Sequence, residues 1–540
     1  MKKAIKMLGV AALAGSLVLA GCSSKPASES NTAKKPSSGT LIYGRGGDSV
    51  SLDPHNVTDG ESFRVTENIY DGLVDYEKEN TKIVPSLATK WSTSEDGKTW
   101  TFELRKDVKF HDGTDFNADA VVYNFERMWD KNHPQHKGDF SYFHDMFGGF
   151  KGEEGSVIQE IKKVDSHTVQ FKLKEPQAPF LANLGMSTFA IISPEALKKH
   201  GDKIGENPVG TGPFKFKEWK RNDSITVEKN DKYWQQGLPK LDKAIFKVIP
   251  DNTARLTALK AGEIDIMDGL NPSDVNQVKG DSRLQILLRP SMNVGYLSLN
   301  NTKKPFDNPK VRQAVSMAVN KKGLIDAFFA GLAEPAKNPL PPSLWGYNKD
   351  IKDYEYNPEK AKQLLAEAGF PNGFETEFWA MPVARPYMPQ PQKIAEAIQA
   401  DLAKIGIKTK IVSFEWATYL KKTKNGEHPM ALLGWTGDNG DPDNFLYVLL
   451  DKNNANPPAA QNISLYKSDK VHDLLVKAQT TSDQAVRAKL YEDAQKFIHE
   501  DAPMVPLVHT TPPLAASKAV KGYQPHPKGS ESLVDVSIEK

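Results

Sequence analysis

The chain has 540 residues and a formal net charge of +2. At about 150 residues per domain, this length predicts roughly three domains, and the near-neutral charge gives no electrostatic signature of nucleic-acid binding. The single cysteine, Cys22, excludes a disulfide framework and a cysteine-based metal cluster.

The N-terminal residues have the pattern of a bacterial lipoprotein leader. A lysine-rich start precedes an apolar stretch over residues 7–20, which is too short to span a bilayer as a helix. This stretch runs into Leu-Ala-Gly-Cys at residues 19–22, which resembles the lipobox whose cysteine receives a diacylglycerol on its sulfur. We therefore expect residues 1–21 to be a cleaved signal peptide and Cys22 to be lipidated.

The segment after Cys22 is predicted to be a flexible tether. Residues 23–39 contain no large apolar side chain, so they cannot bury enough surface to fold. Acyl chains add about 0.8 kcal/mol per buried CH2 group, so residues 22–39 are expected to hold a body at a membrane surface. In that body, helix and strand patterns alternate, which predicts an α/β protein.

The clearest single element in the body is a predicted helix after residue 357. Asn357 is a favourable N-cap, and Pro358 occupies the first helical position. Leu364 and Leu365 mark an apolar face, and Gly369 is a candidate C-cap. These signals predict a helix between Asn357 and Gly369.

A strand–helix–strand unit follows this helix. Residues 374–379 and 407–412 alternate between apolar and polar side chains, as half-buried strands do. Between them, apolar residues recur at helical spacing: Ile394, Ile398, Leu402 and Ile405. The two strands should therefore be parallel and joined by a right-handed crossover.

Two loops of this region are candidates for a ligand site, because ligands of open α/β sheets bind outside the carboxyl ends of the strands. The loop at 380–387 presents Arg385, and the loop at 436–444 presents Asp438 with two further aspartates. From spacing alone, an ordinary surface ion pair is the favoured interpretation of Arg385. The aspartates are alternatively turn formers, and their spacing does not fit an EF-hand calcium loop.

Several longer stretches carry a family resemblance. They are residues 85–88, 94–102, 108–113, 207–214, 310–314, 379–387 and 434–445. In this order they are similar to the dipeptide- and oligopeptide-binding proteins of bacterial ABC importers. This peptide/nickel-binding family, family 5 of the solute-binding proteins, also includes haem and glutathione receptors. The resemblance covers nearly the whole mature chain.

The resemblance implies a periplasmic-binding-protein fold of class II type (cluster C). This is an α/β fold of two lobes around a deep cleft, with an extra domain inserted in the first lobe. The first lobe would combine residues 40–71, 207–289 and 508–540. The inserted domain would cover residues 72–206, and the second lobe residues 290–507.

The resemblance also implies a ligand site. In dipeptide-binding members of the family, an arginine before Pro-Tyr holds the ligand carboxylate, and an aspartate of a Gly-Asp-Asn-Gly-Asp run holds the ligand ammonium. These roles would fall to Arg385 and Asp438, and an early threonine that touches the ligand would correspond to Thr58. Loop neighbours complete the expected set of ligand-binding residues: Pro386, Tyr387, Trp435, Thr436 and Gly437.

Opposite charges at a fixed separation suit a dipeptide. Each added residue would move the peptide termini apart by about 3.3–3.6 Å and leave one charge buried without its partner, at roughly 3–5 kcal/mol. Arginine can hold a carboxylate through two parallel hydrogen bonds. Trp379, Met381, Trp416 and Trp435 could supply adaptable apolar walls, although a core position is the favoured interpretation of each tryptophan except Trp435. Asp441 and Asp443 keep their interpretation as turn formers.

We therefore expect an extracytoplasmic, lipid-anchored binding subunit of an ABC importer that captures dipeptides, or slightly longer peptides, and closes around them. Its expected partners are a dipeptide, the permease subunits with their cytoplasmic ATPases, and the membrane. We expect a monomer without cofactor, metal or nucleic acid. The expected location is the extracytoplasmic face of a Gram-positive-type cell membrane, or the periplasmic face where an outer membrane exists.

Alternatives from several classes remain. The same fold could bind glutathione, haem or a nickel chelate, although paired charges at Arg385 and Asp438 favour a zwitterion. The body could instead be an adhesin, a signalling receptor or an extracytoplasmic peptidase. The sequence contains no nucleophile elbow, P-loop, His-Glu-x-x-His or dinucleotide-binding motif, so we expect a protein that is not an enzyme.

Overall fold

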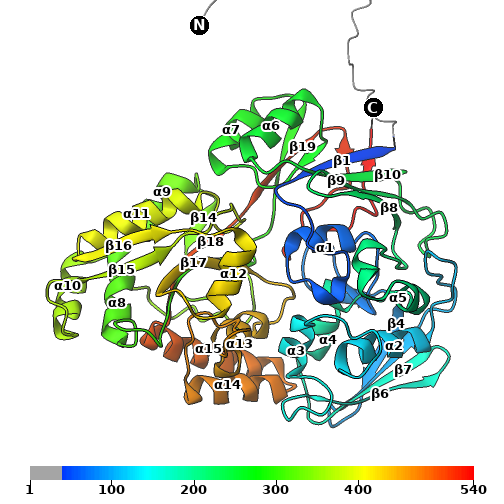
Figure 1. Ribbon diagram of the computed structural model, residues 1–540, viewed down its shortest axis with the longest axis horizontal. Coiled ribbons are helices and arrows are strands. Elements are labelled where there is room, and N and C mark those ends of the chain that lie inside the picture. The colour runs from blue at the N-terminus through cyan, green and yellow to red at the C-terminus, as the bar shows by residue number, and fades with distance from the viewer. Residues whose placement is uncertain (1–38, 540) are drawn as a thin grey trace, which may run out of the picture. The chain divides into compact units, whose positions relative to one another are not determined.

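The computed structural model of the chain describes residues 39–539. The predictions made for residues 1–38, including the signal peptide and the lipidated Cys22, lie outside that part of the chain. Between residues 39 and 539 the strands form three larger sheets and two small ones (Figure 1). None of the helices in this range combines the length and the apolar content that a membrane crossing requires.

The first sheet joins segments that are far apart in the sequence. In spatial order, its strands are β12 (Leu284–Leu288), β19 (Pro513–Ser517), β11 (Ile266–Met267), β1 (Thr40–Arg45), β10 (Lys243–Val248), β9 (Ser224–Lys229) and β8 (Phe214–Lys220). β1 is parallel to both of its neighbours, β10 and β11, and Figure 1 shows β1 in blue beside β10 in green. Both ends of the described chain therefore contribute to one sheet.

The second sheet is built from the chain after residue 290. In spatial order, its strands are β14 (Ala333–Pro335), β18 (Met504–Thr510), β13 (Asn293–Leu299), β17 (Met430–Thr436), β15 (Phe374–Trp379) and β16 (Ile407–Val412). β15 is parallel to both β16 and β17, whereas β13 is antiparallel to β17 and β18. The boundary predicted at residue 508 falls inside β18, and the division into lobes and an inserted domain stays a prediction.

A third, antiparallel sheet is formed by residues that lie between β1 and β8 in the sequence. Its strands are β4 (Ala88–Thr93), β5 (Thr99–Leu104), β7 (Thr168–Leu173) and β6 (Ile158–Asp165). The two small sheets pair β2 (Val74–Tyr76) with β3 (Ile83–Pro85) and β20 (Val520–Lys521) with β21 (Ser537–Ile538).

Helices connect the strands throughout. The α-helices are α1 (Gly60–Thr66), α2 (Ala118–Trp129), α3 (Ser141–Phe147), α4 (Phe180–Leu184), α5 (Pro194–His200), α6 (Asn252–Ala261), α7 (Val275–Lys279), α8 (Pro309–Ala318), α9 (Lys321–Phe328), α10 (Pro358–Glu367), α11 (Pro391–Ala403), α12 (Trp416–Lys424), α13 (Asp443–Leu450), α14 (Asp469–Thr480) and α15 (Gln484–Asp501). Short 3-10 helices are η1 (Pro54–Asn56), η2 (Ser187–Phe189), η3 (Gly201–Glu206), η4 (Pro272–Asp274) and η5 (Lys452–Asn454).

The helix predicted after Asn357 is confirmed as α10. The Asn357 side chain accepts a hydrogen bond of 2.9 Å from the backbone N–H of Lys360, which satisfies one of the free donors at the start of the helix. Gly369 follows the end of the helix with φ of +93°, a conformation that glycine adopts without strain.

The strand–helix–strand unit is also confirmed. β15 and β16 occupy the predicted residues and run parallel, and α11 connects them. Ile405 was predicted to continue the helical spacing, but α11 ends at Ala403. Ile405 is nevertheless buried beyond the end of the helix.

One hydrophobic core continues from the third sheet into helices α13 and α15. Buried Phe102 and Phe171 of the sheet belong to the same cluster as Phe445, Leu449 and Tyr491 of the helices. Removal of this apolar surface from water holds the two segments together.

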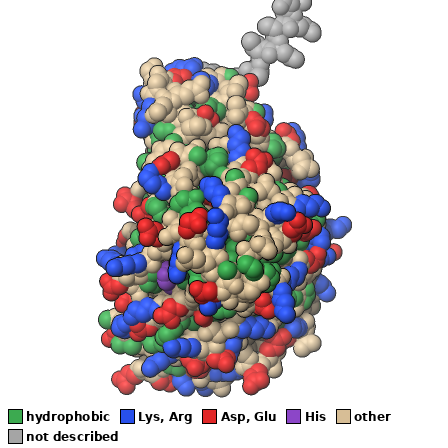
Figure 2. All heavy atoms as spheres, turned by 90° about the vertical axis from the view of Figure 1, so that its left-hand side faces the viewer, with side chains coloured by type: hydrophobic (Ala, Val, Ile, Leu, Met, Phe, Trp, Pro, Cys, Tyr) green, Lys and Arg blue, Asp and Glu red, His purple; other side chains and the backbone are tan. Residues whose placement is uncertain are grey.

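The surface mixes charges of both signs. On the face drawn in Figure 2, acidic and basic side chains are interspersed, with apolar side chains scattered between them. Among residues 39–539 the exposed large apolar side chains are isolated in the sequence: Val50, Val164, Leu288, Tyr356 and Val486. Isolated residues of this kind are ordinary and mark no docking patch.

Candidate ligand-binding site

The two loops singled out in the sequence leave the same edge of the second sheet. β15 and β17 are parallel, with Trp379 paired to Ala431. Arg385 lies in the segment after β15, and Asp438 lies in the segment after β17. Because both segments start at the carboxyl ends of adjacent parallel strands, they emerge where ligands of such sheets bind.

The Asp438 loop is fixed from within by Asn444. The Oδ1 atom of Asn444 accepts hydrogen bonds from the Asp438 backbone N–H at 2.9 Å and from Trp435 Nε1 at 3.1 Å. Its Nδ2 atom lies 3.4 Å from Asp438 Oδ2. Asn444 is buried in the first turn of α13, so one well-packed side chain positions both the backbone and the carboxylate of Asp438.

Thr436 and Gly437 support the backbone that carries Asp438. Thr436 ends β17 and pairs with Asn293 in β13. The Gly437 N–H donates to the Met292 carbonyl at 2.9 Å, and a Cβ atom on Gly437 would lie 2.7 Å from the Phe445 ring. The close approach of this loop to the core therefore requires glycine.

The Asp438 carboxylate is partly exposed and has no cation within ion-pair distance among residues 39–539. Tyr142 on α3 donates a hydrogen bond of 3.0 Å to its Oδ2 atom. Burial raises the pKa of Asp438 to about 7, although hydrogen bonds from Tyr142 and Asn444 and the charge of Lys528 oppose this rise. A carboxylate that loses this much hydration gains from a cationic ligand group.

The Arg385 guanidinium is open to a ligand. Its central carbon lies 4.6 Å from the centroid of the Trp416 ring, and the side chain is partly exposed. Within the described part of the chain it makes no ion pair and no side-chain hydrogen bond, so the ordinary ion pair favoured by spacing alone is absent there. Burial raises the pKa of Asp59, and the Arg385 charge partly opposes this rise, so the two residues are within electrostatic reach.

Tyr387 occupies a slot made by two glycines. Gly295 of β13 and Gly434 of β17 are directly paired, and a Cβ atom on Gly434 would lie 2.2 Å from the Tyr387 ring. The Tyr387 side chain is buried, and reciprocal backbone hydrogen bonds of 3.0 and 2.8 Å join Arg385 to Met388. Buried Tyr387 therefore anchors the turn from which Arg385 projects.

The remaining predicted site residues differ in surroundings. Thr58 is exposed and precedes Asp59, which caps α1 by accepting from the Ser62 backbone N–H at 2.9 Å. The Pro386 carbonyl accepts from Thr510 Oγ1 at 3.0 Å. Ligand contact by Thr58 and Pro386, as by the other predicted site residues, stays a prediction.

The candidate wall residues differ in exposure, and ligand contact by Trp416 and Trp435 stays a prediction. Trp416 and Trp435 are half-buried, and Trp416 lies against Arg385. Trp379 and Met381 are 3% and 1% exposed and belong to the core of the second sheet, so they are not available as walls. The alternation of apolar and polar residues predicted a half-buried strand at Trp379. In the structure, Tyr419 of α12 packs on the Trp379 ring, with centroids 6.2 Å apart.

Asp441 and Asp443 do more than form a turn. Asp441 Oδ1 accepts from the Asp443 backbone N–H at 3.1 Å, as a turn former does. The same oxygen also accepts from Arg487 Nη2 at 2.8 Å, and both partners are buried. Burial and the neighbouring Asp441 charge raise the pKa of Asp443 to about 7. This buried cluster holds α13 against α15.

A cavity beside Asp438 brings in residues that sequence reasoning missed. Phe63 of α1, Tyr142 of α3 and Lys528 line it together with Asp438. The Phe63 and Tyr142 rings are stacked, with centroids 6.2 Å apart and an interplanar angle of 7°. These three residues lie in separate segments and belong to no local motif, so the sequence held no signal that could have placed them here.

The segment around α4 also contacts the Asp438 loop and α14. Asn439 Nδ2 donates to Asn183 Oδ1 at 2.9 Å, and the Ala178 backbone N–H donates to the Gln479 carbonyl at 2.7 Å. Together with the Tyr142–Asp438 hydrogen bond, these contacts enclose the carboxylate from a part of the chain distant in sequence.

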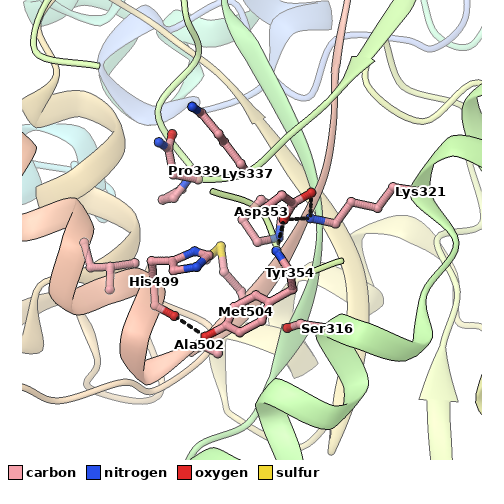
Figure 3. A pocket seen from close by; sticks show the side chains of 12 residues that line it. Ser316, Lys321, Lys337, Pro339, Asp353, Tyr354, His499, Ala502 and Met504 are labelled. Carbon is pink, nitrogen blue, oxygen red and sulfur yellow. Dashed lines mark hydrogen bonds and ion pairs between the residues drawn. The ribbon is translucent and has the colours of Figure 1, made fainter. Parts of the chain in front are cut away.

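A second cavity is separate from this site (Figure 3). Lys321 Nζ lies 2.7 Å from Asp353 Oδ1 and donates to the Ala336 carbonyl at 2.8 Å. The Tyr354 ring stacks on His499, with centroids 4.4 Å apart. Lys321 and Asp353 pair with each other in this cavity, and Lys337 Nζ donates to the Lys349 carbonyl at 2.6 Å. None of the residues that line it comes from the loops of Arg385 or Asp438. Among residues 39–539, no group of three or more His, Cys, Asp or Glu side chains could hold a metal ion.

Comparison with known proteins identifies related chains. The family model described as "Bacterial extracellular solute-binding proteins, family 5 Middle" matches residues 82–457. The chain is 42% identical over 515 residues to the dipeptide-binding protein of Escherichia coli (strain K12), covering 93% of this chain and 95% of that protein. It is 41% identical over 545 residues to heme-binding protein A of Haemophilus influenzae, covering 97% and 98%.

A solved structure of similar fold is the ABC transporter-associated periplasmic binding protein DppA from Helicobacter pylori in complex with peptide STSA. It is 42% identical and superposes with a TM-score of 0.86, covering 93% of this chain and 98% of that chain. The expected two-lobed α/β fold of the periplasmic binding proteins is thereby confirmed.

Proposed function

The chain belongs to the bacterial extracellular solute-binding proteins of family 5, and we propose that it captures dipeptides by their charged termini for an ABC importer. Asp438 would receive the ligand ammonium, and Arg385 would receive the carboxylate. The observation that carries the proposal is that an enclosed aspartate and an unpaired arginine follow adjacent parallel strands. Similarity to a protein named dipeptide-binding supports the ligand class.

The electrostatics of the two residues favour a zwitterion. Asp438 is hard to ionise while it has no counter-charge, as its raised pKa of about 7 reflects, so an ammonium ion gains from pairing with it. The Arg385 guanidinium lies over the Trp416 ring, and within residues 39–539 its side-chain donors make no hydrogen bond. A ligand with one charge at each end would satisfy both groups.

The proposal extends to the place of action. Cys22 would carry the lipid, residues 23–39 would tether a monomeric body to the extracytoplasmic face, and a closed, loaded form would dock on the permease subunits. Metabolic labelling with an alkyne fatty acid tests the anchor. Label on the wild type but not on Cys22→Ser supports it, and label on both contradicts it.

Calorimetry on the purified body tests the ligand. Ala-Ala with free termini should bind, whereas N-acetyl-Ala-Ala and Ala-Ala amide should each bind at least about 30-fold more weakly, because each leaves one buried charge without a partner. In Asp438→Asn, N-acetyl-Ala-Ala should bind as tightly as Ala-Ala with a free amine. In Arg385→Ala, Ala-Ala amide should bind as tightly as Ala-Ala with a free carboxylate. Equal affinity for free and doubly blocked Ala-Ala would contradict the assignment.

Further measurements on the same protein distinguish dipeptide binding from haem binding, from binding of longer peptides and from peptidase activity. A relative named heme-binding is nearly as similar as the dipeptide-binding one, so haem titration followed by absorbance is included. A tetrapeptide series is included because the similar solved structure holds the peptide STSA. Incubation with Ala-Ala followed by amino-acid analysis tests the peptidase alternative, which release of free alanine would support.

A further inference from the structure

The cavity beside Asp438 has a polar floor that the charge pair does not use. Lys528 is 10% exposed and lies 2.9 Å from Oε1 of Glu67, which is 8% exposed. Ser530 Oγ donates to the same oxygen at 2.7 Å, and Ser187 Oγ also donates to it. Three donors from two segments therefore meet at one carboxylate oxygen, and all three donor residues line the cavity.

Lys528 retains unused hydrogen-bonding capacity. An ammonium group has three N–H donors. Within residues 39–539 the Lys528 ammonium has Glu67 as its only ion-pair partner, and it lies 5.5 Å from the centroid of the Tyr76 ring. Burial alone would lower the pKa of Lys528, but the Glu67 and Asp75 carboxylates more than offset this and raise it. The group is therefore a permanently charged donor that faces the cavity and is already neutralised by its neighbours.

The position of the cavity fixes which part of a ligand it receives. Asp438 lines it, whereas no residue of the Arg385 loop does. In a dipeptide the first side chain and the ammonium are attached to the same carbon atom. A dipeptide with its ammonium on Asp438 would therefore direct its first side chain, and not its second, toward this cavity.

The size and polarity of the cavity limit that side chain. The space open to the centre of a water molecule is about 10 Å³, roughly the room of one water. Phe63 and Tyr142 form an apolar side, while Lys528, Ser187 and Ser530 form the polar floor. An apolar group pressed on this floor would leave the Lys528 donors unpaired, and a buried unpaired donor is unfavourable. An added carboxylate would lie beside Asp438, which lines the cavity, and near the Glu67 and Asp75 charges that act on Lys528.

We propose that this cavity is a selective pocket for the N-terminal side chain of the ligand, preferring a small, neutral side chain with an oxygen acceptor, such as that of serine. The inference rests on the proposed function, because it assumes that Asp438 holds the ammonium. Lys528 is the specificity-determining residue, and Glu67 is a positioning residue that holds its ammonium in place.

Calorimetry with near-isosteric ligands tests the pocket. Ser-Ala carries a hydroxyl where 2-aminobutyryl-alanine carries a methyl group, so size is constant. Wild-type protein should bind Ser-Ala about tenfold more tightly than 2-aminobutyryl-alanine, and Leu-Ala more weakly than either. In the charge-neutral double variant Glu67→Gln with Lys528→Met, the ratio between the first two ligands should fall to about one.

A matched double variant controls for loss of a buried ion pair. Lys321→Met with Asp353→Asn removes an equivalent pair in the cavity of Figure 3 and should keep the tenfold ratio. If wild-type protein binds Ser-Ala and 2-aminobutyryl-alanine equally, the proposed pocket is overturned. The proposed function still stands in that case, provided that Ala-Ala binds. Failure to bind any dipeptide would overturn both, and the wild-type ratio decides the question if the double variant does not fold.

Discussion

The Tyr142 hydroxyl donates a hydrogen bond of 3.0 Å to Asp438 Oδ2, joining residues that are 296 positions apart in the sequence. Tyr142 comes from α3 and Asp438 from the loop after β17, so this bond forms only when the two segments are together. The contact links the arrangement of the segments to the charge state of the residue that we propose as the ammonium acceptor.

Tyr142→Phe should weaken dipeptide binding without altering the stacked ring. The hydrogen bond from Tyr142 lowers the pKa of Asp438, so its removal should raise that pKa and reduce the ionised fraction at neutral pH. We expect a loss of about threefold to tenfold at pH 7, as for one hydrogen bond to a charged group, that shrinks at higher pH. Calorimetry measures it, with Tyr123→Phe on α2 as the matched control. A loss independent of pH would contradict this role.

Binding should be linked to proton release near neutral pH. Burial raises the pKa of Asp438 to about 7, and an ammonium ligand binds the ionised form, so the pKa must fall on binding. Affinity should therefore decrease below pH 7 by up to about tenfold per pH unit. It should also decrease above about pH 8, where the ligand amine loses its proton.

Calorimetry in buffers of different ionisation enthalpy counts these protons. Close to one proton should be released per dipeptide near pH 6, and near pH 8 the release should give way to proton uptake, because the ligand amine is then partly deprotonated. In Asp438→Asn the release should vanish, because the other charged neighbour in the cavity, Lys528, has a raised pKa and stays protonated. Constant affinity between pH 5 and 7 would mean that Asp438 does not hold the ammonium.

Arg385 variants should separate binding from stability. Arg385→Lys keeps the charge but loses the planar pair of donors, so we expect about tenfold weaker binding, and about hundredfold for Arg385→Ala. Thermal unfolding should stay nearly unchanged, because no carboxylate within residues 39–539 pairs with this guanidinium. A marked fall in melting temperature with unchanged affinity would identify Arg385 as a structural residue.

Local patterns predicted the framework of the site well. The alternation in β15 and β16, the N-cap at Asn357 and the parallel pairing all depend on neighbours in sequence or on general rules of sheet topology. Arg385 and Asp438 were found because motifs of a family lie at those strand ends. Such signals act over a few residues, and the structure confirms the elements that they predicted.

Long-range packing accounts for what the sequence did not indicate. The burial of Trp379 depends on α12, which covers the strand face that alternation had left half-exposed. Tyr142 and Lys528 reach the Asp438 cavity from opposite ends of the chain. Neither lies in a motif, and a lone tyrosine or lysine carries no information about its partner until the segments are folded together.

Gly434→Ala should impair both stability and binding. A Cβ atom at this position would lie 2.2 Å from the Tyr387 ring, so the ring must leave its slot or β17 must shift, at about 1–3 kcal/mol. Because Tyr387 anchors the turn that carries Arg385, affinity for Ala-Ala should fall with the melting temperature. Gly280→Ala, where the nearest atoms to a new Cβ lie 3.6 Å away, is the matched control and should change neither. If Gly434→Ala lowered stability but left affinity intact, Tyr387 would not position Arg385, and the arginine would depend on Trp416 alone.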